Sequence, residues 1–383
     1  MDDSTIIIKQ NRCFKEVIKE LSDYEEASGA KVNYRKTKGL WTGSWKGRRT
    51  TPLGIEWTSK NVKNLGVYFG NDDPSNNTFS DITPKVSKRL HYWKIFNISP
   101  IGKARTTEIF IASTLVYAIK FYKIPDETAK QVQNEIFDFV NFPQRTKTIE
   151  QKEMWRLRES GGIKLPNIRV KSQISKVKWL IELVSSPDLK AHLCLFERLI
   201  GVQKGNISGR DLLFLPRSYM LRHLKTENAF YKEALVAIAD LEITKGVTSV
   251  DQWDKEHLFY NSLFSLKSDR ERAIPINPYF ERGNFFTFGQ FLDEKTKQAR
   301  DQQYDRRVVA LCDQVALKIP VNKDDMLVLS KGERIKFQDV THKQLYEDRV
   351  LKLPGYHHSQ DKWRHTLQEL SMGRCLVYSA QLS

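Results

Sequence analysis

The hydrophobic pattern of this chain changes its period once, near residue 82, and that change decides which folds are open to it. Before it, the sequence indicates short strands interrupted by one helix. After it, apolar residues recur every three to four positions, which is typical of amphipathic helices. The order strand, helix, strands and then helices excludes a doubly wound sheet. It predicts an α+β fold, predominantly α, in which a small sheet precedes a helical bundle.

The N-terminal part is predicted to open with a buried strand over residues 4–8, a β-branched run bounded by polar residues. An amphipathic helix follows, and Gly29 is expected to end it as a left-handed C-cap. The apolar residues of this helix are Phe14, Val17, Ile18, Leu21 and Tyr24. Further strands are expected within 30–43, 55–59 and 62–70, and the polar stretch 71–81 is expected to be a loop.

Helices are predicted for most of the rest of the chain. Val86, Leu90 and Trp93 share one face of the first helix, so we expect Trp93 to be a core residue. Residues 106–122 are apolar on more than one side and are expected at the centre of the bundle. Asp126 is the expected N-cap of the next helix. The predicted parts are 1–72, 80–145 and 146–383. The spacing of Ile174, Val177, Leu180 and Ile181 predicts a further helix with these residues on its apolar face. From residue 186 on, we expect helices joined by polar loops.

The charge is strongly positive and unevenly spread. Lys and Arg total 62 against 46 Asp and Glu, a net charge of +16. Residues 1–200 hold 34 basic and 22 acidic residues, and residues 201–383 hold 28 and 24. A surplus in one half favours a polyanionic partner, most commonly nucleic acid. The alternative is a basic soluble protein with no such partner.

Several classes of protein are excluded. The four cysteines, Cys13, Cys194, Cys312 and Cys375, lie too far apart for a zinc ribbon or knuckle and imply no disulfide framework. The longest apolar run, 109–119, is shorter than the roughly 20 residues that span a bilayer. The acidic N-terminus lacks the apolar segment of a signal peptide. We therefore expect a cytoplasmic or nuclear protein that is not secreted and has no membrane partner.

Two adjacent aspartates, Asp2 and Asp3, stand before the first predicted strand. Enzymes that use two Mg²⁺ ions hold them with carboxylates that converge at a strand end. Taken alone, the pair is more simply interpreted as a solvated acidic terminus. The residues that follow it change that interpretation.

In their order along the chain, these features resemble the end of the palm of LINE-type reverse transcriptases, from non-LTR retrotransposons. The family's Asp-Asp turn is followed by a helix and a motif that is matched here by Ser28, Gly29, Lys31, Asn33, Lys36 and Thr37. Leu65 and Gly66 look like its primer-grip hairpin, and "KRLHYWKIFNISPIGKAR" resembles the start of its thumb. "ESGGIKLPNI", a turn with a short apolar strand, is similar to a stretch after the polymerase. The resemblance extends to about residue 181 and is looser beyond.

The resemblance implies RNA-directed DNA synthesis by two-metal nucleotidyl transfer, with an RNA template and a DNA primer as partners. Asp2 and Asp3 would hold Mg²⁺, and Lys36 would act at the pyrophosphate leaving group. The family's other metal-binding aspartate has no match in this sequence. We therefore expect a truncated reverse transcriptase that lacks the upstream motifs and has lost catalysis in this chain alone. Whether the chain is an enzyme stays open.

The resemblance also assigns basic residues to a template–primer duplex, where they would contact the backbone without reading sequence. These residues are Lys85, Lys88, Arg89, Lys94, Lys103 and Arg105. Lys46, Arg48 and Arg49 form a second basic group beside Trp41 and Trp45, which are expected to stack on bases. One alternative is a non-catalytic module that grips RNA or an RNA–DNA duplex. Another is an inert product that folds poorly.

Overall fold

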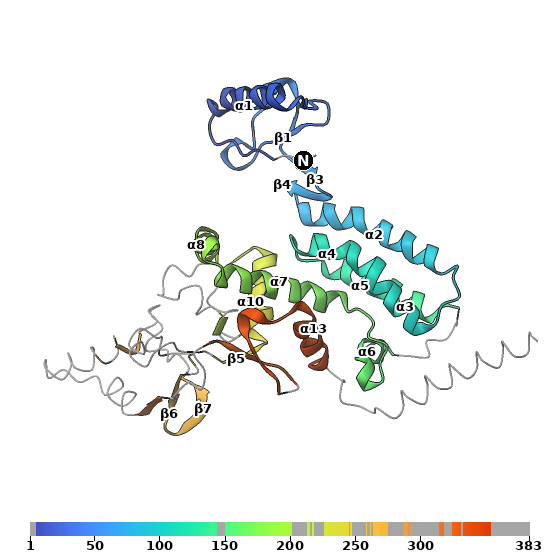
Figure 1. Cartoon of the computed structure of the whole chain (residues 1–383), viewed down its shortest axis with the longest axis vertical. Helices are drawn as coiled ribbons and strands as arrows, with labels where there is room; N and C mark the ends of the chain where they lie inside the picture. The colour runs from blue at the N-terminus through green and yellow to red at the C-terminus, as the bar shows by residue number, and fades with distance from the viewer. Residues whose placement is uncertain are drawn as a thin grey trace, which may run out of the picture. The chain divides into compact units, whose positions relative to one another are not determined.

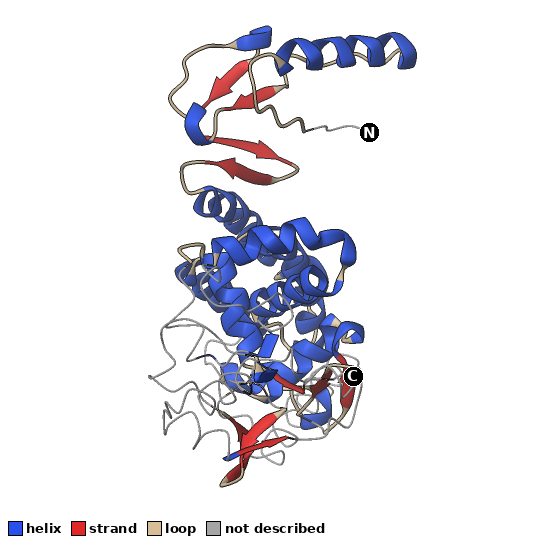
Figure 2. Ribbon diagram, turned by 90° about the vertical axis from the view of Figure 1, so that its left-hand side faces the viewer, coloured by secondary structure: helices blue, strands red, loops and turns tan. Residues whose placement is uncertain are grey.

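The structure is a computed structural model of the chain. It describes residues 5–143, 150–200, 213–214, 217, 226–244, 246, 258, 261, 263–274, 287–289, 292, 314–317, 324–330 and 332–353. The chain divides into two compact units, Met1–Lys88 with Ile124–Thr128, and Arg89–Lys123 with Ala129–Ser383. Helices predominate and the strands are short, which confirms the predicted α+β class (Figure 2).

The first unit contains a helix, a parallel strand pair and a hairpin (Figure 1). Helix α1 (Cys13–Ser28) ends as predicted at Gly29, which has a φ of 71°. Strand β1 (Lys38–Leu40) pairs in parallel with β2 (Glu56–Thr58), and the short turns η1 (Gly43–Trp45) and η2 (Pro52–Gly54) lie between them. Strands β3 (Asn61–Asn64) and β4 (Val67–Gly70) form an antiparallel hairpin. Its two turn residues, Leu65 and Gly66, both have positive φ, as a type I′ turn requires.

The predicted first strand is wrong. Of residues 4–8 the structure describes 5–8, which belong to no strand, and Ile7 is 86% exposed. A β-branched run favours extended backbone, but it becomes a strand only when another segment pairs with it. The described residues offer this run no such partner.

The next predicted strand, within 30–43, is mostly a turn. The backbone N–H of Lys36 donates to the Asn33 side chain at 3.2 Å, and the N–H of Thr37 donates to the Asn33 carbonyl at 3.0 Å. An asparagine that binds nearby backbone groups in this way competes with strand pairing. Only Lys38–Leu40 pairs with a neighbour.

Helix α2 (Pro74–Trp93) begins inside the stretch that was expected to be a loop. The Asp73 carboxylate accepts a hydrogen bond from the Asn76 N–H at 3.0 Å, and Pro74 occupies the first helical turn, where its missing N–H costs nothing. Phe79, Val86 and Leu90 are buried along one face. Capping residues thus start a helix within a stretch whose polar composition is typical of a loop.

In the second unit, one helical segment is interrupted by a wider turn. It consists of α3 (Pro100–Thr106), the π-helical turn η3 (Thr107–Ala112) and α4 (Ser113–Ile119). The next helix, α5 (Asp126–Asn141), starts at Asp126 itself, so this residue lies in the first turn and not at the N-cap. The remaining helical elements described are α6 (Gln151–Trp155), η4 (Arg158–Ser160), α7 (Ile168–Ser185), η5 (Pro187–Leu189), α8 (Lys190–Leu199), α10 (Ala229–Ala239), η10 (Phe337–Asp339) and α13 (His342–Leu351).

Helix α7 is at the centre of the second unit's core. It packs against α10 and α13, and Val177, Leu180 and Ile181 are buried on it as predicted. Before α7, the "GGIKLPNI" stretch forms no strand. The backbone N–H of Leu165 donates to the Met154 carbonyl at 2.8 Å instead, which ties this stretch to α6.

The expectation of helices and loops alone beyond residue 186 is wrong. Strands β5 (Glu242–Thr244), β9 (Met326–Val328) and β10 (Arg334–Lys336) form one sheet in the order β10-β9-β5. Strands β6 (Phe264–Leu266), β7 (Asp269–Ala273) and β8 (Val315–Leu317) form another in the order β7-β6-β8. Strands of three to five residues are too short to show an alternating pattern. In addition, β9, which pairs with β5, and β8, which pairs with β6, lie far along the sequence.

Candidate nucleic-acid interface

Of the three residues expected to be catalytic, the structure describes only Lys36. Asp2 and Asp3 lie outside the described residues. Lys36 is exposed in the turn that follows α1. In the part of the chain that the structure describes, no group of three or more His, Cys, Asp or Glu residues is arranged to hold a metal ion. The assignment of Mg²⁺ to Asp2 and Asp3 stays a prediction.

The basic group between β1 and β2 is held by local contacts. The Arg48 guanidinium lies 3.9 Å from the centroid of the Trp45 ring and donates to the Asn11 side chain at 2.6 Å. Lys46 makes an exposed ion pair with Asp72 at 3.4 Å. Arg49 is exposed. This group therefore presents cations to solvent, but Arg48 and Lys46 already have partners.

Trp41 cannot act as a stacking platform for bases, contrary to the expectation. Its side chain is 2% exposed, and its ring stacks on Trp57 with 4.0 Å between centroids. Phe14 from α1 packs edge-on against both of these rings. Trp45 is half-buried, with the Arg48 guanidinium over its ring. These aromatic residues form the core that joins α1 to the short sheet.

Lys103 was also expected to contact nucleic acid, and this prediction is wrong. Its side chain is buried and is not accessible to such a partner. Its Nζ donates to the carbonyl of Phe142 and lies 3.5 Å from that of Val140, at the end of α5. The last carbonyls of a helix have no intrahelical donor, and a cation is favoured there. Lys103 therefore stabilises the packing of α3 on α5. Arg105, two residues later, is exposed.

The other predicted cations of this region are accessible. Lys85 and Lys88 are exposed on α2. Within the second unit, the exposed Arg89 donates to the Phe110 carbonyl at 3.1 Å and to the Thr114 hydroxyl. The half-buried Lys94 lies 5.7 Å from the centroid of the Phe142 ring. The contacts of Arg89 hold its guanidinium beside the π-helical turn.

One carboxylate lies close to these cations in sequence. Asp81, one turn before Lys85, pairs with Lys63 of the hairpin. The hydrogen bond from Lys63 is the main reason that the pKa of Asp81 is lowered and that of Lys63 is raised. Asp81 is thus already engaged by the hairpin lysine.

Aromatic side chains gather around Arg89 and Lys94. Trp93 stacks on Phe110 with 5.0 Å between ring centroids and lies 5.3 Å from the ring of Phe96. Tyr92 packs edge-on against Phe96 at 5.5 Å. Tyr92, Phe96 and Phe110 are nevertheless exposed. We call the set Arg89, Tyr92, Trp93, Lys94, Phe96 and Phe110 the aromatic–basic patch.

The local backbone explains why these rings reach the surface. Residues 106–122 were expected in the core, yet Ile109, Phe110, Tyr117 and Phe121 are exposed. The π-helical turn accommodates one extra residue, which changes the direction of the side chains around it. Trp93, which was expected in the core, is only half-buried and packs against these surface rings. Sequence reasoning missed Tyr92, Phe96 and Phe110. The consecutive apolar residues beyond a single helix face were the available signal.

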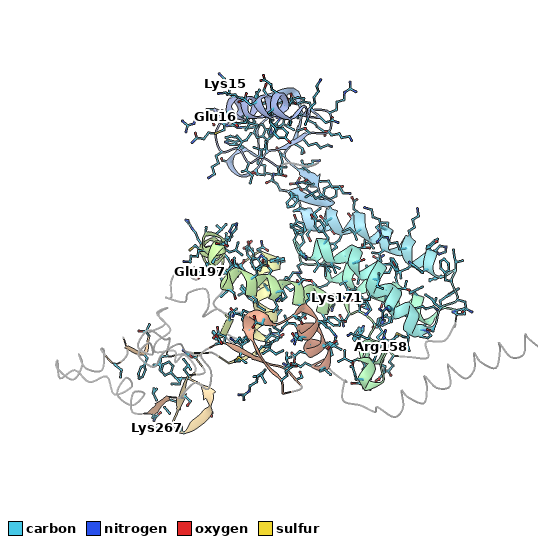
Figure 3. All side chains as sticks on the ribbon, in the orientation of Figure 1. Lys15, Glu16, Arg158, Lys171, Glu197 and Lys267 are labelled. Carbon is cyan, nitrogen blue, oxygen red and sulfur yellow. The ribbon has the colours of Figure 1, made fainter. Side chains whose placement is uncertain are left out.

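Two lysines on the inner side of the second unit are paired with glutamates. Lys171 of α7, labelled in Figure 3, lies 2.7 Å from Glu108 of the π-helical turn. Lys164 pairs with Glu347 of α13 at 2.6 Å. These pairs tie α7 to the π-helical turn and the stretch before α7 to α13.

No protein-family model matches the chain. It is 26% identical over 311 residues to a protein of Xenopus laevis, the transposon TX1 uncharacterized 149 kDa protein. The match covers 79% of this chain and 23% of that protein, so the chain spans about a quarter of the relative's length. No described helix is long and apolar enough to cross a membrane. The comparison thus relates this chain to the proteins of transposable elements.

Proposed function

We propose that the chain is a nucleic-acid-binding part of a LINE-type reverse transcriptase, and that it grips RNA or an RNA–DNA duplex through the aromatic–basic patch. The observation that carries this proposal is the grouping of exposed rings and cations at the end of α2 and on the π-helical turn. The similarity to a transposon protein supports the choice of family.

The chemistry of the patch suits a polynucleotide. Cations such as Arg89 and Lys94 attract phosphates independently of sequence, and their binding releases counterions. Exposed rings such as Phe96 and Phe110 provide faces on which unpaired bases stack, which contributes about 1–3 kcal/mol per base. Arg105, an exposed cation of the same unit, would add to the electrostatic contact.

We further propose that this chain alone does not extend a primer. Two-metal transfer needs several carboxylates around two ions, and only Asp2 and Asp3 match the family's metal-binding residues. Primer extension with Mg²⁺ and dNTPs tests this. Synthesis by the purified chain that is lost in Asp2→Ala would overturn it and would make the chain a polymerase.

The binding proposal is tested by comparing two pairs of substitutions that remove the same charge. The first pair, Lys94→Gln with Arg105→Gln, which we call the patch pair, changes Lys94 of the patch and the exposed Arg105 of α3. The second, Lys190→Gln with Arg198→Gln, changes exposed residues of α8. Affinity for an RNA–DNA duplex is measured by fluorescence anisotropy from 50 to 200 mM salt.

Each phosphate contact contributes about 0.9 to the slope of log K against log salt, so the first pair should reduce this slope by about 1.8. Across a fourfold salt range, the advantage of the wild type over this pair should then shrink about tenfold. The α8 pair should behave like the wild type. Equal effects of the two pairs would mean that only net charge matters, and the patch assignment would be wrong.

A further inference from the structure

The second unit contains an open cavity of about 520 Å³. It lies where the N-terminal end of α7 meets the C-terminal ends of α10 and α13. The residues that matter for its chemistry are Arg169, Arg217, Arg349, Lys352, Asp240 and Trp155. All of them lie outside the aromatic–basic patch.

Positive charge dominates this lining, with four cationic side chains and one carboxylate. Asp240 is shared by two of the cations, since it lies 2.6 Å from Arg349 and 3.3 Å from Arg217. Lys352 pairs at 3.1 Å with Asp348, which lies behind it on α13. The shared carboxylate holds both arginines at the cavity.

The cavity fits a phosphate ester better than other small ligands. Arginine presents a planar set of N–H donors that matches phosphate oxygens, and such bonds are stronger where solvent is partly excluded. Arg349 is in such a place, with 22% of its side chain exposed. A terminal phosphate carries nearly two negative charges at pH 7, which suits four cations better than a singly charged carboxylate does.

The remaining wall suits the rest of a nucleotide. Trp155 provides an aromatic surface, and its ring is supported by Phe137 at 5.9 Å between centroids. The volume lies in the range of about 300–1,000 Å³ that is usual for pockets of small ligands. A base or ribose could therefore pack against this wall while the arginines bind the phosphate.

We propose that this cavity binds the terminal phosphate of a nucleotide, either a free nucleotide or the end of a nucleic-acid strand. The strand form deepens the proposed function and rests on it. The free-nucleotide form stands without it.

The test compares the full wild-type chain with the double variant Arg169→Gln/Arg217→Gln, which we call the cavity pair. These two side chains are exposed, and Arg349 still pairs with Asp240 in the variant, so the fold should survive; thermal unfolding followed by circular dichroism checks this. The probes are AMP, measured by calorimetry, and a 3′-labelled ten-nucleotide oligothymidylate with either a 5′-phosphate or a 5′-hydroxyl, measured by anisotropy. Lys94→Gln with Arg105→Gln is the matched control.

We expect the wild type to bind the 5′-phosphorylated strand at least about fivefold tighter than the 5′-hydroxyl strand, and the cavity pair to reduce this ratio to about one. The patch pair should weaken both strands and keep the ratio. If the wild type binds AMP and the cavity pair does not, the site also accepts free nucleotides. Preference for the 5′-phosphate without AMP binding would assign it to strand ends.

The proposal is overturned if the wild type shows neither the 5′-phosphate preference nor AMP binding, or if either persists in the cavity pair. The outcome of the cavity test does not depend on whether nucleic acid binds at the aromatic–basic patch. If the patch pair leaves strand affinity unchanged, the proposed function fails, but loss of the preference in the cavity pair would still support the cavity.

Discussion

Lys176 and Glu233 form a buried ion pair that joins α7 to α10. Helix α7 carries Arg169 of the cavity, and Asp240 of the cavity is the C-cap of α10. The ammonium of Lys176, which is 0% exposed, lies 3.0 Å from the Glu233 carboxylate. It also donates to the Ser172 hydroxyl at 2.8 Å and to the Ile119 carbonyl at 3.1 Å. Burial lowers the pKa of Lys176, and Glu233 partly offsets this. Removing the charge of Glu233 and removing the charge of Lys176 should therefore lower the free energy of unfolding by different amounts.

Glu233→Gln leaves a fully buried ammonium without its carboxylate, so we expect a loss of about 3–5 kcal/mol in the free energy of unfolding. Lys176→Met should cost less, about 1–3 kcal/mol, because Glu233 is partly exposed and keeps the Ser172 hydroxyl as a donor. The double variant Lys176→Met/Glu233→Met removes both charges. It should recover most of the loss of Glu233→Gln, because a buried pair replaced by apolar residues is often nearly neutral.

Urea unfolding at pH 7, with hydrogen exchange of the α7 and α10 amides, measures these differences in the second unit. The dependence of the free energy of unfolding on pH provides a second measurement. Between the lowered folded-state pKa and the ordinary value of 10.5, the unfolded chain binds the extra proton, so stability rises with pH. The rise should be larger in Glu233→Gln and absent in Lys176→Met. A loss below about 1 kcal/mol in Glu233→Gln, or a greater loss in Lys176→Met, would refute this reasoning.

Three further substitutions test the packing and the turns. Gly39→Ala should cost about 1–3 kcal/mol because its Cβ would lie 2.2 Å from the Trp57 ring, whereas Gly47→Ala meets nothing within 4 Å and should be nearly neutral in thermal unfolding. Tyr346→Phe removes the acceptor of the Asn167 N–H, 2.8 Å away, and should cost about 1–3 kcal/mol at pH 7. Burial raises the pKa of Tyr346, so the stability of the wild type should fall as the pH rises above 10, and the part of this fall due to Tyr346 should disappear in the variant. Leu65→Asn should stabilise the hairpin by about 1 kcal/mol, since Leu65 has a φ of 48° and asparagine adopts this conformation more readily; no gain in urea unfolding would contradict it.

Amphipathic helices could be predicted because the period of their apolar residues and their capping residues are local features of the sequence. The period of Val177, Leu180 and Ile181 placed α7, and Gly29 located the end of α1. Local chemistry alone sufficed in these cases. The same local features are ambiguous at Asp73 and Pro74. These residue types are common both in loops and at the start of a helix, and here they start α2.

Features that depend on distant partners could not be predicted. Residues 5–8 have the composition of a strand but no described segment pairs with them, and β5 pairs with a strand more than 80 residues later. Lys103 and Arg105 look alike in sequence, yet only Lys103 meets the carbonyls at the end of α5. The cavity likewise combines residues from α6, α7, α13 and the C-terminal end of α10, which are separated along the chain.

The central claim is that nucleic acid binds at the aromatic–basic patch, and mapping the contact by photocrosslinking tests it most directly. An RNA–DNA duplex with a single-stranded extension carrying 5-iodouracil, which reacts with aromatic side chains on irradiation, is bound to the full chain and the crosslinked peptides are sequenced. We expect crosslinks at Tyr92, Phe96 or Phe110 that decline as salt rises. Crosslinks confined to other segments, with these three rings unmodified, would contradict it.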